Sequence, residues 1–338
     1  MFFEKLNSMP LKYRLLIYGG GGLILLLLPL FITNTYLLRV AIMVGVYVVL
    51  ASSLNIIIGF TGMFSLGHGA FYGIGAYTSA LLAVNFGMTF WLSMPLGGIL
   101  AAAVGAFLGL STLHLRHTFL VFGTLAFGEI VRIIILNWNS LTRGPRGIPG
   151  VPPPEAFGFV FDGYVAYYYL MFVFTVLVIF LIYRLYKSRI GRAFLALRED
   201  ERAASSMGVN VFGYKVLAFT LACFFAGLTG AFYAHLATYI SADQFGIMES
   251  FLILSMVAIG GTGSILGPIL GGVLLMLIPE IFRFLAEYRM LFYGVVLILV
   301  VVLKPEGIAG IKAFFPREES VLDLLFGKHK KRASERAT

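Results

Sequence analysis

Apolar stretches of about 20 residues follow one another along almost the whole of this 338-residue chain. A stretch of that length, folded as an α-helix, crosses a hydrocarbon core of about 30 Å. Only 12% of the residues are charged, whereas a soluble domain carries about 25%. The pattern predicts an all-α polytopic membrane protein and argues against a soluble enzyme.

About ten of these stretches are expected to span or enter the membrane, within a transmembrane domain of residues 15–303. They are Leu15–Ile32, Val40–Ile58, Phe64–Val84, Trp91–Leu113, Phe119–Leu136, Tyr164–Tyr186, Val216–Ala237, Gly246–Ile259, Ser264–Phe282 and Met290–Leu303. The eighth, with about 14 residues, is expected to be a half-length or tilted element. The first has the basic flank of a secretory signal, but its length and lack of a clear cleavage site favour a retained span.

The positions of the basic residues predict the orientation of the spans. Lys and Arg lie in short loops and tails, where they mark the cytoplasmic side; the net charge of +9 therefore indicates membrane topology rather than nucleic-acid binding. The N-terminal residues 1–14 and the basic tail 304–338 both fall on the cytoplasmic side if Gly246–Phe282 contains two segments. The single Cys223 excludes an intramolecular disulfide.

One polar stretch, KSRIGRAFLALREDERAASSMGVNVFGYK from Lys187 to Lys215, interrupts the apolar pattern. It places four arginines beside three consecutive acidic residues and ends its helix-forming part at a glycine: Arg189, Arg192, Arg198, Arg202, Glu199, Asp200, Glu201 and Gly208. A short charged helix between two spans is suited to docking a soluble partner. A moving partner on a multi-span protein suggests driven transport.

Two glycine-rich breaks, at residues 59–62 and 260–263, resemble an internal repeat. Each reads G-x-T-G, with Thr61 or Thr262 in the motif, Ser65 or Ser264 soon after, and small residues at helix-packing spacing in Gly69, Gly73, Gly263, Gly267 and Gly271. Matching breaks in two halves point to the pathway of a duplicated transporter. Both breaks are therefore candidate pathway walls, and chance similarity between glycine-containing spans is the alternative.

Polar residues within the spans are further pathway or gate candidates. Ser65, His68 and Thr124 lie in or near the first repeat and the fifth stretch. His68 would either gate permeation or fix helix packing as a neutral, hydrogen-bonded ring. Glu129 and Arg132, three apart on one helix face, would either line the pathway or lock two helices.

The loop of residues 137–163 is rich in proline and carries Arg143 and Arg146. It would serve as a rigid connector or as an outer ledge for an acidic external protein. The sequence contains no G-x-x-x-x-G-K-[ST] phosphate loop and no Cys pair, H-E-x-x-H motif or carboxylate cluster. We therefore expect no catalytic residue, no metal and no cofactor bound by this chain.

Five sequence blocks carry a resemblance to a known family: LNIIIGFTGMFSLGHGAFYGIGAYTSALL, FGTLAFGEIVRIIILNW, TRGPRGIPGVP, GRAFLALREDERAASSMGVN and IGGTGSILGPILGG. From Val40 to Gly310 the chain closely resembles permease subunits of branched-chain amino acid ABC importers, of the leucine/isoleucine/valine type. The resemblance implies a plasma (inner) membrane location, a sister permease, two cytoplasmic ATPase subunits that hold ATP and Mg, and an extracytoplasmic solute-binding protein. It implies contact with membrane lipid and none with nucleic acid.

The resemblance also implies that loop 187–214 docks the ATPases. The Glu-x-Ala-Ala stretch of such loops, which ends in Gly, is matched by Glu201, Ala203, Ala204 and Gly208, preceded by Arg192, Arg198, Glu199 and Asp200. Two departures stand out. LRHTFLVFG replaces the usual LRG-type stretch before the fifth span, and Arg143 replaces one of two glycines after the outer-loop threonine, which would alter contact with the binding protein.

We therefore expect a pathway-forming subunit of an importer for branched-chain or related amino acids. Urea, short amides or other amino acids are alternative solutes within the same architecture. An ATP-independent carrier would need a coupling-ion site, normally an acidic residue deep in a span, and only Glu129 approaches that description. A membrane scaffold would leave the broken repeats and the charged loop unexplained.

Overall fold

The computed structural model describes residues 26–29, 34–112, 117–156, 158–281, 294 and 307. These residues are mostly helical, as spans require, because a helix satisfies its own backbone hydrogen bonds in lipid. The predicted first and last spans, Leu15–Ile32 and Met290–Leu303, lie outside the described residues except for short pieces. The same holds for the predicted terminal regions 1–14 and 304–338.

Six helices in the described part of the chain are long and apolar enough to cross a membrane, which confirms a multi-span protein. They are Thr35–Phe60, Phe90–Thr112, Phe119–Asn137, Tyr164–Lys187, Val211–Ala237 and Ala242–Gly260. The predicted stretch Phe64–Val84 forms α4 (His68–Phe86). The predicted half-length stretch forms α12 (Ile247–Gly260), a helix of 14 residues.

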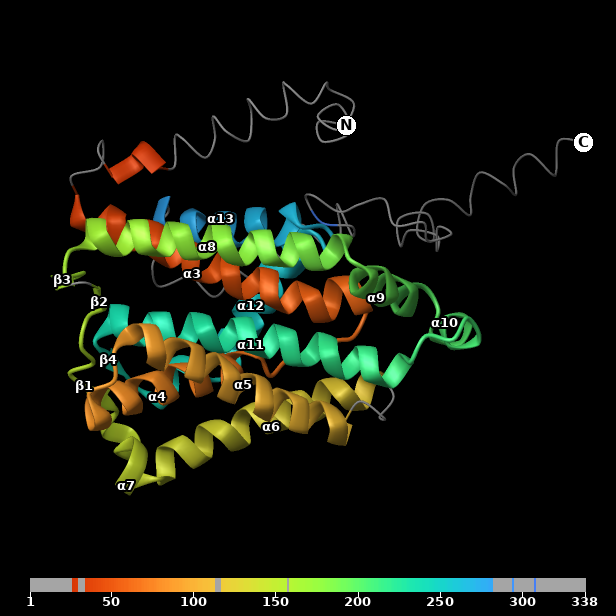
Figure 1. Cartoon of the computed structure of the whole chain (residues 1–338), viewed down its shortest axis with the longest axis horizontal. Coiled ribbons are helices and arrows are strands. Elements are labelled where there is room, and N and C mark those ends of the chain that lie inside the picture. The colour runs from red at the N-terminus through yellow and green to blue at the C-terminus, as the bar shows by residue number, and fades with distance from the viewer. Residues whose placement is uncertain are drawn as a thin grey trace, which may run out of the picture.

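The long helices lie side by side along the long axis of the molecule (Figure 1). Besides α4 and α12 they are α3 (Thr35–Asn55), continued by the π-helical turn η1 (Ile56–Phe60), α5 (Phe90–Thr112), α6 (His117–Asn137), α8 (Tyr164–Lys187), α11 (Val211–Ala237) and α13 (Leu266–Ile281). α11 packs against α3, α4 and α5, while α3 also packs against α8, α12 and α13. The helices α3 and α11 therefore form the centre of the bundle.

Glycines bring the backbones of α4, α5 and α11 into direct contact. A Cβ built on Gly97 would lie 2.8 Å from the carbonyl oxygen of Gly75, and one on Gly227 would lie 2.5 Å from the Cβ of Ala101. A side chain on Gly75 would overlap the backbone of Gly227. Small residues permit such close approach in lipid, where the hydrophobic effect does little to associate helices. Sequence reasoning placed close packing at the two breaks and missed this contact.

One end of the molecule, here called the strand end, carries short segments between the long helices (Figure 1). They are α7 (Asn139–Thr142), η2 (Gly144–Arg146), β1 (Ile148–Pro149), β2 (Glu155–Ala156), β3 (Phe159–Val160) and β4 (Tyr239–Ile240), with β1 paired to β4 and β2 to β3, both antiparallel. Buried His235 of α11 bonds Pro152 O through Nδ1 (2.7 Å) and Ser79 Oγ through Nε2 (2.9 Å). Since a carbonyl oxygen only accepts, Nδ1 carries a proton and donates it to Pro152 O.

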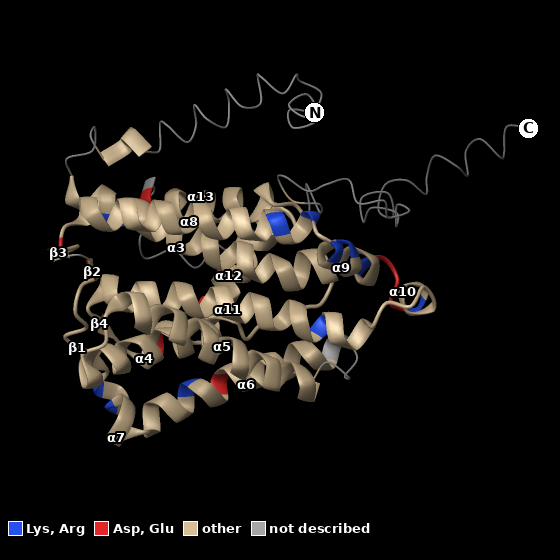
Figure 2. Cartoon of the chain, in the orientation of Figure 1, with Lys and Arg blue, Asp and Glu red and all other residues tan. Residues whose placement is uncertain are grey.

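The opposite end, here called the α10 end, is formed by α9 (Arg189–Glu199) and α10 (Glu201–Ser206), which extend beyond the long helices (Figure 1). Asp200 begins α10 by accepting hydrogen bonds from the N–H groups of Arg202 and Ala203, which satisfies first-turn donors. Figure 2 shows Lys and Arg gathered on α9, α10 and the adjoining ends of α8 and α11, with a second basic group beside α7.

Candidate functional site at the two helix breaks

The first predicted break opens the backbone after η1. Thr61 Oγ1 donates to the carbonyl oxygen of Ile57 (2.7 Å), and Met63 N donates to the same oxygen (3.2 Å). Gly62 has a φ of +72°, a conformation that favours glycine, and the backbone stays non-helical until α4 begins at His68. A π-helical turn followed by open backbone is a feature often found at functional sites.

The second predicted break separates α12 from α13. Gly261 and Gly263 have φ values of +111° and +82°, so both positions favour glycine. Ser264 Oγ accepts a 2.8 Å hydrogen bond from Gly267 N, which satisfies a donor in the first turn of α13. A side chain on Gly260 would overlap Gly267. The chain therefore turns back on itself with the two helices in backbone contact.

Asn55 joins the two breaks. It lies at the end of α3 and is 1% exposed. Its Nδ2 donates to Ser264 O (2.8 Å) and its Oδ1 accepts from Gly263 N (3.0 Å). Sequence reasoning missed this residue. The available signal was an amide in an apolar helix beside a break, because a buried amide is costly unless it is hydrogen-bonded.

Arg198 reaches from α9 to the same place. Its Nη1 donates a 2.6 Å hydrogen bond to the carbonyl oxygen of Gly59 in η1. Its guanidinium also lies against Gly263, where any side chain would collide with it. This predicted docking residue is therefore directed into the molecule. The polar loop and both helix breaks meet at Arg198.

The other predicted residues of the first break gather around the open backbone before α4. His68 is fully buried, and its Nε2 lies 2.8 Å from Ser53 Oγ. Thr124 Oγ1 on α6 accepts a 3.0 Å hydrogen bond from Leu66 N. Among the described residues, His68 Nδ1 and Ser65 Oγ are buried without a hydrogen-bond partner. The structure thus brings Ser65, His68 and Thr124 together and leaves two polar atoms there unused.

Two of the acidic docking candidates make contacts within this chain. The N–H groups of Ala203 and Arg202 lower the pKa of the Asp200 carboxyl. Glu201 forms an ion pair with Lys215 of α11, whose side chain is 11% exposed. The remaining candidates are the exposed Arg192, Glu199 and Ala203, the buried Ala204, and Gly208, which follows α10 with a φ of +82°. The exposed candidates are the ones that a partner could reach.

Met207, at the tip of α10, is a residue that sequence reasoning missed. It is 85% exposed, the highest value among the exposed large hydrophobic side chains of the described residues. α10 extends beyond the long helices (Figure 1), so contact with lipid tails does not account for this exposure. A single methionine after a polar helix gives no pattern that a sequence could reveal.

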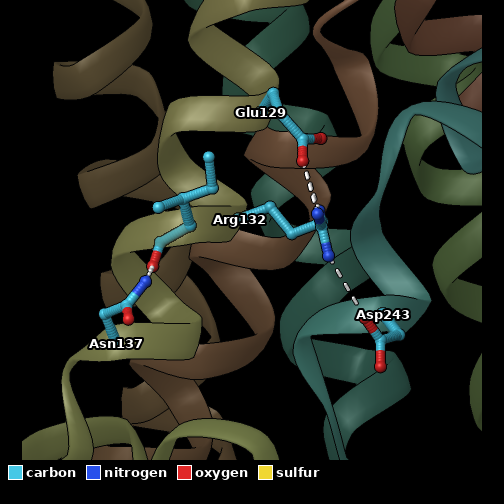
Figure 3. Close-up of polar contacts among 5 residues, drawn as sticks. Glu129, Arg132, Asn137 and Asp243 are labelled. Atoms are coloured by element: carbon cyan, nitrogen blue, oxygen red, sulfur yellow. Dashed lines mark hydrogen bonds and ion pairs between the residues drawn. The ribbon is translucent and has the colours of Figure 1, made fainter.

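Glu129 and Arg132 of α6 form a charged group with Asp243 (Figure 3). Arg132 Nε donates to Glu129 Oε1 at 2.8 Å, and Arg132 Nη1 lies 3.3 Å from Asp243 Oδ1 in η3 (Ala242–Phe245). The Arg132 and Glu129 side chains are 28% and 29% exposed. The group ties α6 to the segment that leads into α12. Its third member, Asp243, was not part of the predicted pair.

Of the small residues predicted to pack helices, two lie where α4 meets α12 and η3, and the others lie at the second break. Gly69 N of α4 donates a 2.9 Å hydrogen bond to Ser250 Oγ of α12, and a Cβ on Gly73 would lie 2.8 Å from Phe245. At the second break, Gly267 and Gly271 of α13 lie against α12, whereas Gly263 and the half-buried Thr262 lie in the break itself. Gly263 thus contacts Arg198 rather than packing two helices.

The segment between α6 and α8 contains a basic hollow of about 490 Å³ lined by Asn139, Arg143, Pro145 and Arg146. Arg143 has a φ of +60°, a left-handed conformation that costs a residue with a Cβ about 1–2 kcal/mol. This backbone conformation favours glycine, which is the residue that the family resemblance led us to expect here. The arginine adopts it nonetheless and adds a charge to the hollow.

The described residues contain no group of three or more His, Cys, Asp or Glu that could hold a metal ion. What they do contain is a bundle of spans in which a charged loop beyond the helices is hydrogen-bonded to the first break and lies against the second. This arrangement defines the class as a multi-pass membrane transport protein. Residues 36–301 match the family described as branched-chain amino acid transport system, permease component, and the chain belongs to this family.

Relatives of known name agree with this family. The high-affinity branched-chain amino acid transport system permease protein LivM of Salmonella typhimurium is 38% identical over 292 residues, which cover 80% of this chain and 69% of the relative. LivM of Escherichia coli is 37% identical over 292 residues, which again cover 80% of this chain and 69% of the relative. LivH of Escherichia coli is 27% identical, over 78% of this chain and 91% of the relative. No solved structure matches the chain.

Proposed function

We propose that this chain is a transmembrane subunit of an ATP-driven, binding-protein-dependent importer for branched-chain or related amino acids. Escherichia coli has two different relatives named as permease proteins of a high-affinity branched-chain amino acid transport system, LivM and LivH. This supports a pathway formed with a sister permease in the plasma (inner) membrane. ATP and Mg would bind to partner ATPase subunits and not to this chain.

The hydrogen bond from Arg198 to Gly59 carries the proposal. It bonds a loop beyond the spans to the point where two breaks meet. A carrier driven by an ion gradient needs no such connection, whereas a pathway opened by a soluble motor does. Movement of loop 187–214 by the ATPases would rearrange the breaks, with Ser65, His68 and Thr124 on the pathway side.

The proposed orientation has the α10 end in the cytoplasm. Basic residues gather there (Figure 2), as expected of a cytoplasmic face. The eight helices α3–α6, α8 and α11–α13 together with the predicted Leu15–Ile32 and Met290–Leu303 would make ten segments. An even number of segments places both termini on the cytoplasmic side.

Each end of the molecule would receive a soluble partner. At the α10 end, the exposed Arg192, Glu199 and Met207 would contact one of two ATPase subunits. At the strand end, Arg143 and Arg146 line a basic hollow, which suits an acidic surface on the solute-binding protein. Solute released there would enter between this chain and its sister permease.

Purification and reconstitution would test the proposal. The tagged full-length chain is extracted in mild detergent, the co-purifying proteins are identified by mass spectrometry, and the complex is placed in liposomes with internal ATP. We expect a second multi-span permease, Walker-motif ATPases, and ATP-dependent uptake of labelled leucine. Competition by urea or acetamide instead of leucine would redirect the solute assignment. Uptake by the partner-free chain without ATP would establish the carrier.

A further inference from the structure

We propose that Arg198 is a positioning residue that transmits the movement of the docking loop to the two helix breaks. The inference rests on the proposed function and adds to it the link between ATPase docking and the pathway. The loop sequence alone places Arg198 among the docking charges. Its geometry separates it from the exposed charges of the same loop.

The contact with η1 is directional and specific. Gly59 belongs to the last turn of a helix, where carbonyl oxygens lack intrahelical donors and carry the negative end of the helix dipole. The Arg198 guanidinium fills that position with a 2.6 Å hydrogen bond. Hydrogen bonds with an ionised donor are roughly twice as strong as neutral ones. The loop is therefore held to the end of the first broken helix by a charged hydrogen bond.

Two glycines leave the space that the Arg198 side chain occupies. A Cβ on Gly62 would lie 3.4 Å from Arg198 Cγ, and one on Gly263 would collide with the guanidinium. Gly263 also donates to Asn55, which in turn bonds Ser264. A displacement of Arg198 thus acts on the first break directly and on the second through Gly263.

The segment that joins Arg198 to the docking helix α10 is short, and contacts of Asp200 and Glu201 restrict it. Arg198 lies two positions before Asp200, whose side chain accepts from the first-turn N–H groups of α10. The next residue, Glu201, pairs with Lys215 on α11. These contacts restrict the backbone between Arg198 and α10. A movement imposed on α10 is therefore passed to the arginine rather than absorbed by a flexible connection.

The test measures coupling rather than activity alone. The whole importer is reconstituted with Arg198→Gln, Arg198→Lys or the control Arg184→Gln, which changes an exposed arginine in the last turn of α8, outside the docking loop. ATP hydrolysis and solute uptake are recorded in the same liposomes. We expect Arg198→Gln to keep its ATPases and hydrolyse ATP while solute moved per ATP falls about tenfold, the scale of one lost charged hydrogen bond. Arg198→Lys should restore part of this ratio, and Arg184→Gln should leave it unchanged.

Two results would overturn the inference. One is a wild-type ratio of solute to ATP in Arg198→Gln. The other is loss of the ATPases from that variant with a normal ratio in the remaining complexes, which would make Arg198 a docking residue. If Arg198→Gln is not recovered as a complex, Arg198→Lys decides, because it keeps the charge without the planar fork and must lower the ratio. Absence of ATP-dependent uptake by the wild type would instead contradict the proposed function.

Discussion

Asn55 Nδ2 donates a 2.8 Å hydrogen bond to the carbonyl oxygen of Ser264, a residue 209 positions further along the chain. With the bond from Gly263 N to its Oδ1, this one amide holds together two breaks that belong to different halves of the sequence. The two breaks are therefore parts of one structural unit.

Replacing Asn55 should loosen that unit. Asn55→Ala leaves Gly263 N and Ser264 O without these partners, and an unsatisfied buried group costs about 1–3 kcal/mol. The purified complex should melt at a lower temperature in differential scanning fluorimetry. Asn137→Ala is the control, because among the described residues the bond of that exposed amide is to Ile133 O of its own helix. Equal melting temperatures for the two variants would contradict a joining role for Asn55.

Met207 should be an anchor for the ATPase. Burying a methionine side chain contributes about 1.5–3 kcal/mol, so Met207→Ser should weaken ATPase binding about tenfold or more, measured by titrating ATPase onto the immobilised permease. Solute moved per ATP in the complexes that do form should stay normal. Met248→Ser, at a side chain 70% exposed near the start of α12, should have no effect on binding. Unchanged affinity in Met207→Ser would remove this anchor from the interface.

The Glu201–Lys215 pair should hold the docking helix on α11. Glu201→Lys places two like charges together, one of them on a side chain only 11% exposed, and uptake should be abolished while the protein is still expressed. Adding Lys215→Glu restores opposite charges and should recover part of the uptake, as in a double-mutant cycle. If the double variant is no better than Glu201→Lys, Glu201 acts on a partner subunit rather than on Lys215.

Asp200 should cap α10 at all physiological pH values. Its pKa is lowered from the ordinary 3.8 by the N–H groups of Ala203 and Arg202, so the stabilisation is present above the ordinary pKa and is lost as pH falls through the lowered one. Hydrogen exchange at those two amides should be faster in Asp200→Ala at neutral pH and nearly unchanged in Asp200→Asn, because asparagine also caps helices. Equal protection in the alanine variant would argue against the cap.

Arg143 should lower the stability of the chain and strengthen its binding to the solute-binding protein. Arg143→Gly relieves a left-handed backbone at an arginine, so the melting temperature should rise, by the equivalent of about 1 kcal/mol. The same change removes a charge from the hollow beside α7 and should weaken binding of the solute-binding protein, measured by surface plasmon resonance at low salt. Arg143→Asn tolerates the backbone and should lose binding only. Undiminished binding by both variants would remove Arg143 from the partner surface.

The spans were predictable because membrane burial is a local property of sequence. Runs of apolar side chains identify helices such as α8 and α11 without knowledge of their neighbours. A cytoplasmic position of the basic tail further required two segments within Gly246–Phe282, and the structure has α12 and α13 there. The breaks were equally visible, since Gly62, Gly261 and Gly263 adopt positive φ values that few other residues accept.

The contacts between these parts were not predictable, because they depend on which distant segments the fold brings together. Nothing in the local sequence distinguishes Arg198, which points inward, from exposed Arg192 six positions earlier. The bonds of Asn55 join residues more than 200 positions apart. The prediction therefore located the elements of the site and assigned Arg198 to a partner, while the structure gives it a contact within the chain.

The glycine contacts among α4, α5 and α11 have a consequence for how the pathway opens. Where Gly75, Gly97 and Gly227 meet, backbone touches backbone, and there are no side chains that could adopt a second set of rotamers. Rotating one of these helices would leave an empty gap or force a collision. We therefore expect the three helices to stay fixed as a frame through every transport cycle, while movement is confined to segments held by side-chain bonds that can break and form again.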